Sequence, residues 1–461
     1  MGKRNREKRA AKRRDRRRQG ATPPGSAGGT HRREFPWEAG NGTDDPDRGE
    51  PFSQPPPPTT EALAIMILGA AQDYQAGDAG SPNRCAAQLS AREFAGQRTV
   101  AIAAAIAFAT MIDKAWKSGW LPIDVVELIK RRSNEAAVSL LVDAIAADTA
   151  EHAPATVPAR WAAQVEQLDA TVWWRHDEPH LMQWMARYRA GMRETLVAAI
   201  ELLGRLMTLP KLPRILPLPG TASRDAATSA AGVNQKVLAR VRGLLAKAES
   251  TEFPEEAEAL SAKAQELMNR HAFERALLDA DAHHQQSATS IRMWLDNPYA
   301  EAKSHLVAAI ADANRCRSVF YAKIGFVALV GEEMDLEITE LLATSLLVQA
   351  TRAMVAEGSQ TTFTGTSRTR SFRRSFLISY AVRIGERLAD AGTRAHDPVE
   401  DARLLPVLAA RSRVVEETFE EMIGETVRKR VSISNGAGWD AGRTAADRAD
   451  LDIERRAVER V

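Results

Sequence analysis

Apolar positions recur at helical spacing through most of the chain, which predicts a mainly α-helical protein. Between residues 61 and 208, alanine-rich helical segments are interrupted at Ser81–Pro82, at Leu121–Pro122 and around residues 154–158, where proline breaks the pattern. We therefore expect an N-terminal helical bundle over residues 61–208. Its longest apolar run, Val100–Ile112, is shorter than the roughly 20 residues that cross a bilayer, so we interpret it as a buried core helix and expect no membrane contact.

A helical hairpin is predicted after a proline-, glycine- and serine-rich linker over residues 209–232. Two amphipathic segments fill residues 233–280, and Pro254 suits the first position of the second helix, where its missing N–H costs nothing. Glu255 and Glu256 then place negative charge at the positive end of that helix dipole. The apolar faces that should pack together contain Val237, Leu238, Val241, Leu244, Leu245 and Ala248 in the first helix, and Ala257, Leu260, Ala264, Leu267 and Met268 in the second.

The C-terminal part, residues 288–461, mixes strand and helix patterns and predicts a small α+β domain. The expected strands are Ile291–Leu295, Ser318–Tyr321, Gly325–Val330 and Arg430–Ser434, and the expected helices are Asp335–Ala356, Phe372–Ala391 and Ala402–Ile423. The second and third strands are separated by only a few residues, with Gly325 available for the turn, so we pair them as a hairpin.

Charge is distributed unevenly along the chain. The first 18 residues hold eleven Lys or Arg and two acidic residues, a net +9, whereas the whole chain carries only +2. A block of like charges repels itself and buries nothing, so we predict a disordered basic tail over residues 1–60. The arginines expected to contact nucleic-acid phosphates are Arg13, Arg14, Arg16, Arg17 and Arg18. The alternative is a solubilising arm with no fixed partner.

Motifs of catalysis and metal binding are absent from the sequence. Cys85 and Cys316 are too few for a disulfide framework or a thiolate zinc site, which favours a reducing, cytoplasmic location. The groups His176-Asp-Glu-Pro-His180 and His283-His284 lack zinc-site spacing, and we interpret both as solvated loops. No phosphate-binding loop or nucleophile elbow is present. We therefore assign no catalytic residue, metal or cofactor.

Two further groups of residues have a structural interpretation and a functional one. Trp161, Trp173, Trp174 and Trp184 are interpreted as core or interhelix side chains, with a base-stacking surface as the alternative. Gly436, Gly438 and Gly442 follow a G-x-G-x-x-x-G pattern, which differs from a dinucleotide loop. We interpret these glycines as sites where the backbone packs closely against a neighbouring helix.

Arginines crowd the beginning of the predicted helix Phe372–Ala391, at Arg368, Arg370, Arg373 and Arg374. Cations at a helix N-terminus oppose the macrodipole at a cost of roughly 0.3 to 1 kcal/mol each. An anion there would be held by both the free N–H groups and the guanidinium groups. The pattern predicts a phosphate or nucleic-acid site. The alternative is that acidic residues elsewhere in the fold pair with these arginines.

Two stretches resemble a known family. The segments Lys236–Thr251, KVLARVRGLLAKAEST, and Glu255–Met268, EEAEALSAKAQELM, are similar to the bacterial and phage family called domain of unknown function 2786 (DUF2786). The stretches Arg370–Phe376, RSFRRSF, and Gly438–Ala446, GWDAGRTAA, look like its companion C-terminal region. The resemblance implies a helical element and a bacterial origin, and the excess of arginine over lysine suggests an actinobacterial one. It implies no activity.

These observations favour a non-enzymatic, cytoplasmic, nucleic-acid-associated protein that uses a basic arm and an arginine-rich helix N-terminus. Two alternatives stay open. One is an enzyme of unknown class with an anion-binding pocket near Arg370–Arg374. The other is a protein-interaction module that docks a partner through the helical hairpin.

Overall fold

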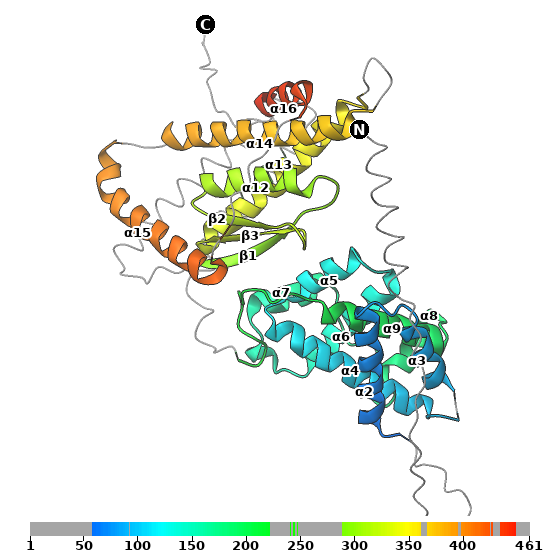
Figure 1. Ribbon diagram of the computed structural model, residues 1–461. Coiled ribbons are helices and arrows are strands. Elements are labelled where there is room, and N and C mark those ends of the chain that lie inside the picture. The colour runs from blue at the N-terminus through cyan, green and yellow to red at the C-terminus, as the bar shows by residue number, and fades with distance from the viewer. Residues whose placement is uncertain are drawn as a thin grey trace, which may run out of the picture. The chain divides into compact units, whose positions relative to one another are not determined.

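The computed structural model describes residues 58–221 except Arg92, residues 240, 243, 244 and 247, and residues 288–360, 367–394, 398–424, 426 and 434–448 (Figure 1). The predicted basic tail, most of the predicted hairpin, and the strand at Arg430–Ser434 apart from Ser434 lie outside these residues. The structure is mostly helical with one small antiparallel sheet, which confirms the predicted fold class.

The helical bundle follows the predicted pattern, and proline sets several of its boundaries. Its helices are α2 (Thr60–Gln75), α3 (Ser81–Ser90), α4 (Gln97–Lys117), α5 (Pro122–Lys130), α6 (Glu135–Ala150), α7 (Ala159–Gln167), α8 (His180–Tyr188) and α9 (Met192–Met207), with a short 3₁₀ turn, η1 (Pro154–Thr156). Pro82 and Pro122 stand in the first turns of α3 and α5, where the missing N–H breaks no intrahelical bond. A proline between two helical patterns therefore marks the start of the second helix.

Helix α4 runs through the bundle and contacts α2, α6, α8 and α9. Among the described helices, it alone is long and apolar enough, by length and composition, to cross a membrane, and 56% of its apolar window is buried in the bundle. Its buried face is rich in alanine, which lets the neighbouring helices approach closely.

Tryptophan contributes to the bundle core as predicted. Trp161 is 1% exposed and Trp184 is 3% exposed, while Trp173 and Trp174 are half-buried and pack against the core. The segment that follows α9 also packs against the bundle. The carbonyl of Pro210 in this segment accepts a hydrogen bond from the indole N–H of Trp120 at 2.8 Å.

The C-terminal region builds a three-stranded sheet and helices. Its elements are β1 (Thr289–Trp294), α12 (Ala300–Ala313), β2 (Arg317–Tyr321), β3 (Phe326–Gly331), α13 (Glu333–Ala356), α14 (Thr369–Arg394), α15 (Pro398–Ile423) and α16 (Gly436–Arg448). Strand β3 lies between β1 and β2 and is antiparallel to both, with Trp294 opposite Phe326 and Arg317 opposite Val330. The predicted hairpin is confirmed, and Gly325 takes the positive φ of +107° that its turn requires.

Helix α12 was not among the predicted helices. Its residues are good helix formers, but several alanines and short polar side chains weaken the apolar periodicity. Three predicted helices also begin earlier than expected, because α13 starts at Glu333, α14 at Thr369 and α15 at Pro398. The earlier start of α14 places Arg370 inside its first turn.

Helices α14 and α16 pack closely against one another (Figure 1). Gly438 lies against Phe372 and Gly442 against Phe376, so both helices advance together along the contact. A Cβ at Gly442 would lie 2.8 Å from the Cα of Phe376 and overlap its carbonyl oxygen. This contact confirms the predicted close backbone packing for Gly438 and Gly442. The prediction is wrong for Gly436, which has open space around it because it stands at the first position of α16.

Candidate functional site

The candidate site is the N-terminal end of α14, where the predicted arginines lie. Arg368 directly precedes the helix and is exposed, Arg370 is exposed in its first turn, and Arg373 and Arg374 are half-buried in the next turn. The helix is held by an apolar stripe of buried side chains. This stripe consists of Phe372, Phe376, Leu377, Tyr380, Ala381, Ile384 and Leu388.

The N-terminus of α16 meets the N-terminus of α14 at the same end of the pair. Asn435, just before α16, accepts a hydrogen bond from the Gly438 N–H at 2.9 Å and donates from its amide to Ser371 Oγ at 3.5 Å. Because the two helices run in the same direction, the positive ends of their dipoles point the same way. The first turn of any helix also leaves backbone N–H groups without intrahelical acceptors.

Acidic partners are sparse around this end of α14. Arg374 lies 3.7 Å from a carboxylate oxygen of Glu301, and both side chains are more than a third exposed. No carboxylate within the described residues forms an ion pair with Arg368 or Arg370. The Nε of Arg373 is buried and has no hydrogen-bond partner among them. The structure thus pairs one of the four predicted arginines, and does so weakly.

Further along, three ion pairs form within and between the same two helices. Arg443 on α16 donates to Glu386 on α14 at 2.8 Å, and Arg383 donates to Glu386 at 2.9 Å and to Asp447. The hydrogen bonds from Arg443 and Arg383 lower the pKa of Glu386. Arg383 and Arg443 therefore have acidic partners within the helix pair, whereas Arg368 and Arg370 have none among the described residues.

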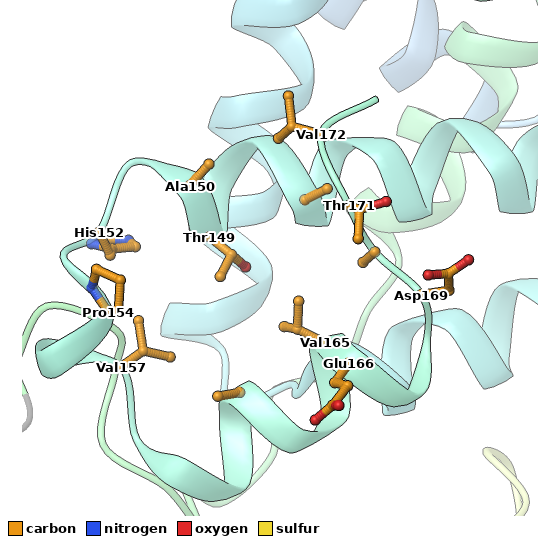
Figure 2. A pocket seen from close by; sticks show the side chains of 13 residues that line it. Thr149, Ala150, His152, Pro154, Val157, Val165, Glu166, Asp169, Thr171 and Val172 are labelled. Carbon is orange, nitrogen blue, oxygen red and sulfur yellow. The ribbon is translucent and has the colours of Figure 1, made fainter. Parts of the chain in front are cut away.

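A cavity of about 540 Å³ lies in the bundle, between the end of α6, the turn η1, α7 and the segment after it (Figure 2). Its wall is mainly apolar, and Val165 and Thr149 project into it, whereas Asp169 points away. A typical ligand site adds a few convergent polar groups to such a wall. The polar residues here, which include His152 and Glu166, are spread around the rim, and none of the four predicted arginines lines the cavity.

The interpretation of His180 as part of a solvated loop is wrong. His180 begins α8 and is mostly buried, with its Nε2 2.7 Å from the carboxylate of Asp143 on α6. Trp173 donates its indole N–H to the same carboxylate at 2.9 Å. One turn along both helices, the indole N–H of Trp184 on α8 donates to Ser139 on α6 at 3.1 Å. The correct account is a row of polar contacts between α6 and α8. The sequence carries no local signal of it, because the two helices are about 40 residues apart.

The other residues of that group behave as expected. His176, Asp177 and Glu178 are exposed. Within the described part of the chain, no three His, Cys, Asp or Glu side chains come close enough together to hold a metal ion. The pair His283–His284 lies outside the described residues, as do Arg13, Arg14, Arg16, Arg17 and Arg18.

A buried ion pair that sequence analysis missed joins the bundle to the sheet. Arg292 on β1 donates to the carboxylate of Asp124 on α5 at 2.6 Å and to the carbonyl of Pro213 at 2.7 Å, and the Trp294 indole donates to Asp124 at 2.8 Å. Burial raises the pKa of the Asp124 carboxyl, and the positive charge of Arg292 opposes that rise. Both charged side chains are almost completely buried and face one another. This arrangement makes a structural brace that leaves no open position for a substrate.

Comparison with known proteins adds one finding. Residues 236–275 match the model of a family described as proteins of unknown function, DUF2786. The match confirms the resemblance for a small part of the chain, where the hairpin is predicted. Of the matched residues, only 240, 243, 244 and 247 are described, and Leu244 packs against the core of the C-terminal region. No curated protein and no solved structure matches the chain.

Proposed function

We propose that this protein binds the phosphate groups of nucleic acid without catalysing a reaction. The binding site would consist of the adjacent N-termini of α14 and α16 together with Arg368 and Arg370. The observation that carries the proposal is the pair of exposed arginines, free of acidic partners in the described residues, at the end where two helix dipoles point in the same direction. The predicted basic arm would add contacts that are independent of nucleic-acid sequence.

The physical argument compares the free site with the occupied one. Each helix N-terminus carries roughly half a positive elementary charge, so arginines placed there raise the electrostatic energy of the empty site. A phosphate relieves this repulsion and accepts hydrogen bonds from the backbone N–H groups and from the planar guanidinium groups. Arginines that served as internal braces would instead face buried carboxylates, as Arg292 faces Asp124.

The test removes these two charges and measures nucleic-acid binding. Arg368→Gln combined with Arg370→Gln should weaken the binding of labelled duplex DNA or RNA in fluorescence anisotropy. The slope of log K against log salt should become shallower by about 2, because each phosphate contact on a duplex contributes roughly 0.9. Folding stability should change by no more than about 0.5 kcal/mol, because both side chains are at the surface.

A matched control removes the same charge elsewhere. Arg193→Gln combined with Arg413→Gln changes two exposed arginines on α9 and α15 for which no ion pair is formed among the described residues. This control should keep the affinity and salt slope of the unmodified chain. Equal affinity and slope for the Arg368/Arg370 variant would refute the proposal.

A second arm of the experiment addresses the basic tail. Deleting residues Met1–Arg18 should leave the thermal midpoint unchanged, weaken nucleic-acid binding and flatten its salt dependence, because these residues would contribute phosphate contacts but no core. Purification with and without nuclease treatment, followed by the ratio of absorbance at the nucleic-acid and protein maxima, gives an independent readout. If the deletion changed neither affinity nor slope, the arm would have no part in binding.

A further inference from the structure

Helix α4 presents an uncharged apolar stripe on the surface of the bundle. Ile102 and Ile106 are 39% and 37% exposed, and Ala105 and Ala109 beside them are exposed as well. At 100° per residue these four positions fall within one arc of about 100°. The opposite face of α4 forms the bundle core, so this helix carries two apolar faces, of which the described residues cover only one.

The stripe ends in opposite charges. Arg98 lies on the same arc one turn before Ile102, and Asp113 lies on it one turn after Ala109. Their Cα atoms are about 22 Å apart along the helix axis. Arg98 is exposed and donates to the carbonyl of Asp177 at 3.0 Å, and Asp113 forms an exposed ion pair with Lys117 at 2.7 Å. Both charged side chains are therefore accessible to another molecule at the protein surface.

The order of these residues is nearly symmetric about the midpoint between Ala105 and Ile106. Turning a second α4 end over end about that point places Arg98 opposite Asp113, Ile102 opposite Ala109, and Ala105 opposite Ile106. Each isoleucine then faces an alanine, so large and small side chains alternate across the contact. Arg98 of one copy then attracts Asp113 of the other at each end of the contact, because a two-fold axis repeats every pairing.

We propose that the occupant of this face is a second copy of the chain, bound through an antiparallel α4–α4 contact. A parallel pairing would set Arg98 against Arg98 and Asp113 against Asp113, which costs energy, so the charges select the antiparallel arrangement. One helix pair buries less area than a standard interface, so the dimer should be weak, with a Kd on the order of micromolar. This inference is independent of the proposed nucleic-acid site.

The primary experiment is sedimentation of the full chain over about a hundredfold range of concentration. The unmodified chain should shift from monomer to dimer. Ile106→Glu, at the centre of the contact, should raise the dimer Kd at least about 100-fold, because it places two carboxylates in the apolar stripe. Val382→Glu on α14 is the matched control, because Val382 is 43% exposed and the substitution adds the same negative charge at a position away from α4. It should leave the Kd unchanged.

A charge exchange tests the antiparallel geometry. Arg98→Glu alone and Asp113→Arg alone should each weaken the dimer by roughly 10-fold, because each creates like-charge pairs. The double variant restores opposite charges at both ends and should return to within about 3-fold of the unmodified Kd. Circular dichroism melts of every variant should match the unmodified chain and show that the fold is kept.

Three results would overturn the inference that the stripe is a dimer contact, and a fourth would overturn its antiparallel geometry. The first is a chain that stays monomeric throughout the concentration range. The second is a dimer that Ile106→Glu leaves intact, which would place the interface elsewhere. The third is a monomer that sediments with neutral lipid vesicles and loses this binding in Ile106→Glu, which would assign the stripe to a lipid surface. Failure of the charge exchange to restore affinity would exclude the antiparallel arrangement.

Discussion

Removal of the buried carboxylate at Asp124 tests the link between the bundle and the sheet. Asp124 is 3% exposed and accepts hydrogen bonds from Arg292 at 2.6 Å and Trp294 at 2.8 Å. In Asp124→Ala the guanidinium of Arg292 keeps its contact with Pro213 but loses its only ion-pair partner within the described residues. A buried charge left without its partner costs about 3 to 5 kcal/mol. The indole N–H of Trp294, left without its acceptor, costs about 1 to 3 kcal/mol on its own.

The assay is urea unfolding followed by tryptophan fluorescence and by far-ultraviolet circular dichroism. Fluorescence should report the unfolding of the tryptophan-containing cores, and circular dichroism should report the helices as a whole. Asp177→Ala is the control, because Asp177 is exposed and its side chain forms a surface ion pair with the exposed Arg175. It should leave the free energy of unfolding almost unchanged, because a surface ion pair contributes little.

A double variant separates the electrostatic contribution of the ion pair from the contribution of side-chain packing. Asp124→Leu with Arg292→Met replaces both charges by apolar side chains, and the loss should be well below that of Asp124→Ala, because no uncompensated charge stays buried. A change of less than about 0.5 kcal/mol in Asp124→Ala would show that the carboxylate is solvated and the brace absent. A double variant as unstable as the single one would refute the charge argument and leave packing as the cause.

Two other predictions concern the helix pair and the pH dependence of stability. Gly442→Ala should lower the free energy of unfolding by about 1 to 3 kcal/mol in denaturant melts, because the added Cβ overlaps the backbone of Phe376, whereas Gly69→Ala on α2, with open space around it, should be neutral or raise it by up to about 1 kcal/mol. Asp148→Asn should raise stability at pH 7, and this gain should shrink as the pH falls towards about 3.9, the unfolded value. The sign follows because burial raises the pKa of Asp148 despite its hydrogen bond from Trp116, so the folded state binds more protons than the unfolded state in that window. A gain for Asp148→Asn that was constant with pH, or equal losses in the two glycine variants, would contradict these predictions.

Local patterns determined most of the helices and the sheet hairpin of this protein. Apolar residues recur every three or four positions from Phe372 to Leu388, and this spacing encodes α14 whatever element the helix packs against. Gly325 specified the turn between β2 and β3, since few other residues accept its positive φ. The spacing of Gly438 and Gly442 likewise anticipated a close backbone contact, because two residues without side chains one turn apart leave a groove on a helix. Each of these signals acts over a few residues, which is the range that a sequence pattern encodes.

Tertiary structure alone decided which charged residues from distant parts of the chain meet. Asp124 and Arg292 are 168 residues apart, and neither stands in a pattern that names the other as its partner. The pairing of His180 with Asp143 depends on how α6 and α8 pack. The same holds at α14, where the sequence located four arginines, but only the fold brought Glu301 close to Arg374 and left Arg368 and Arg370 exposed. Ion pairs between distant elements depend on side-chain positions set by the whole core, because charge acts through space and the pattern along the chain records only neighbours.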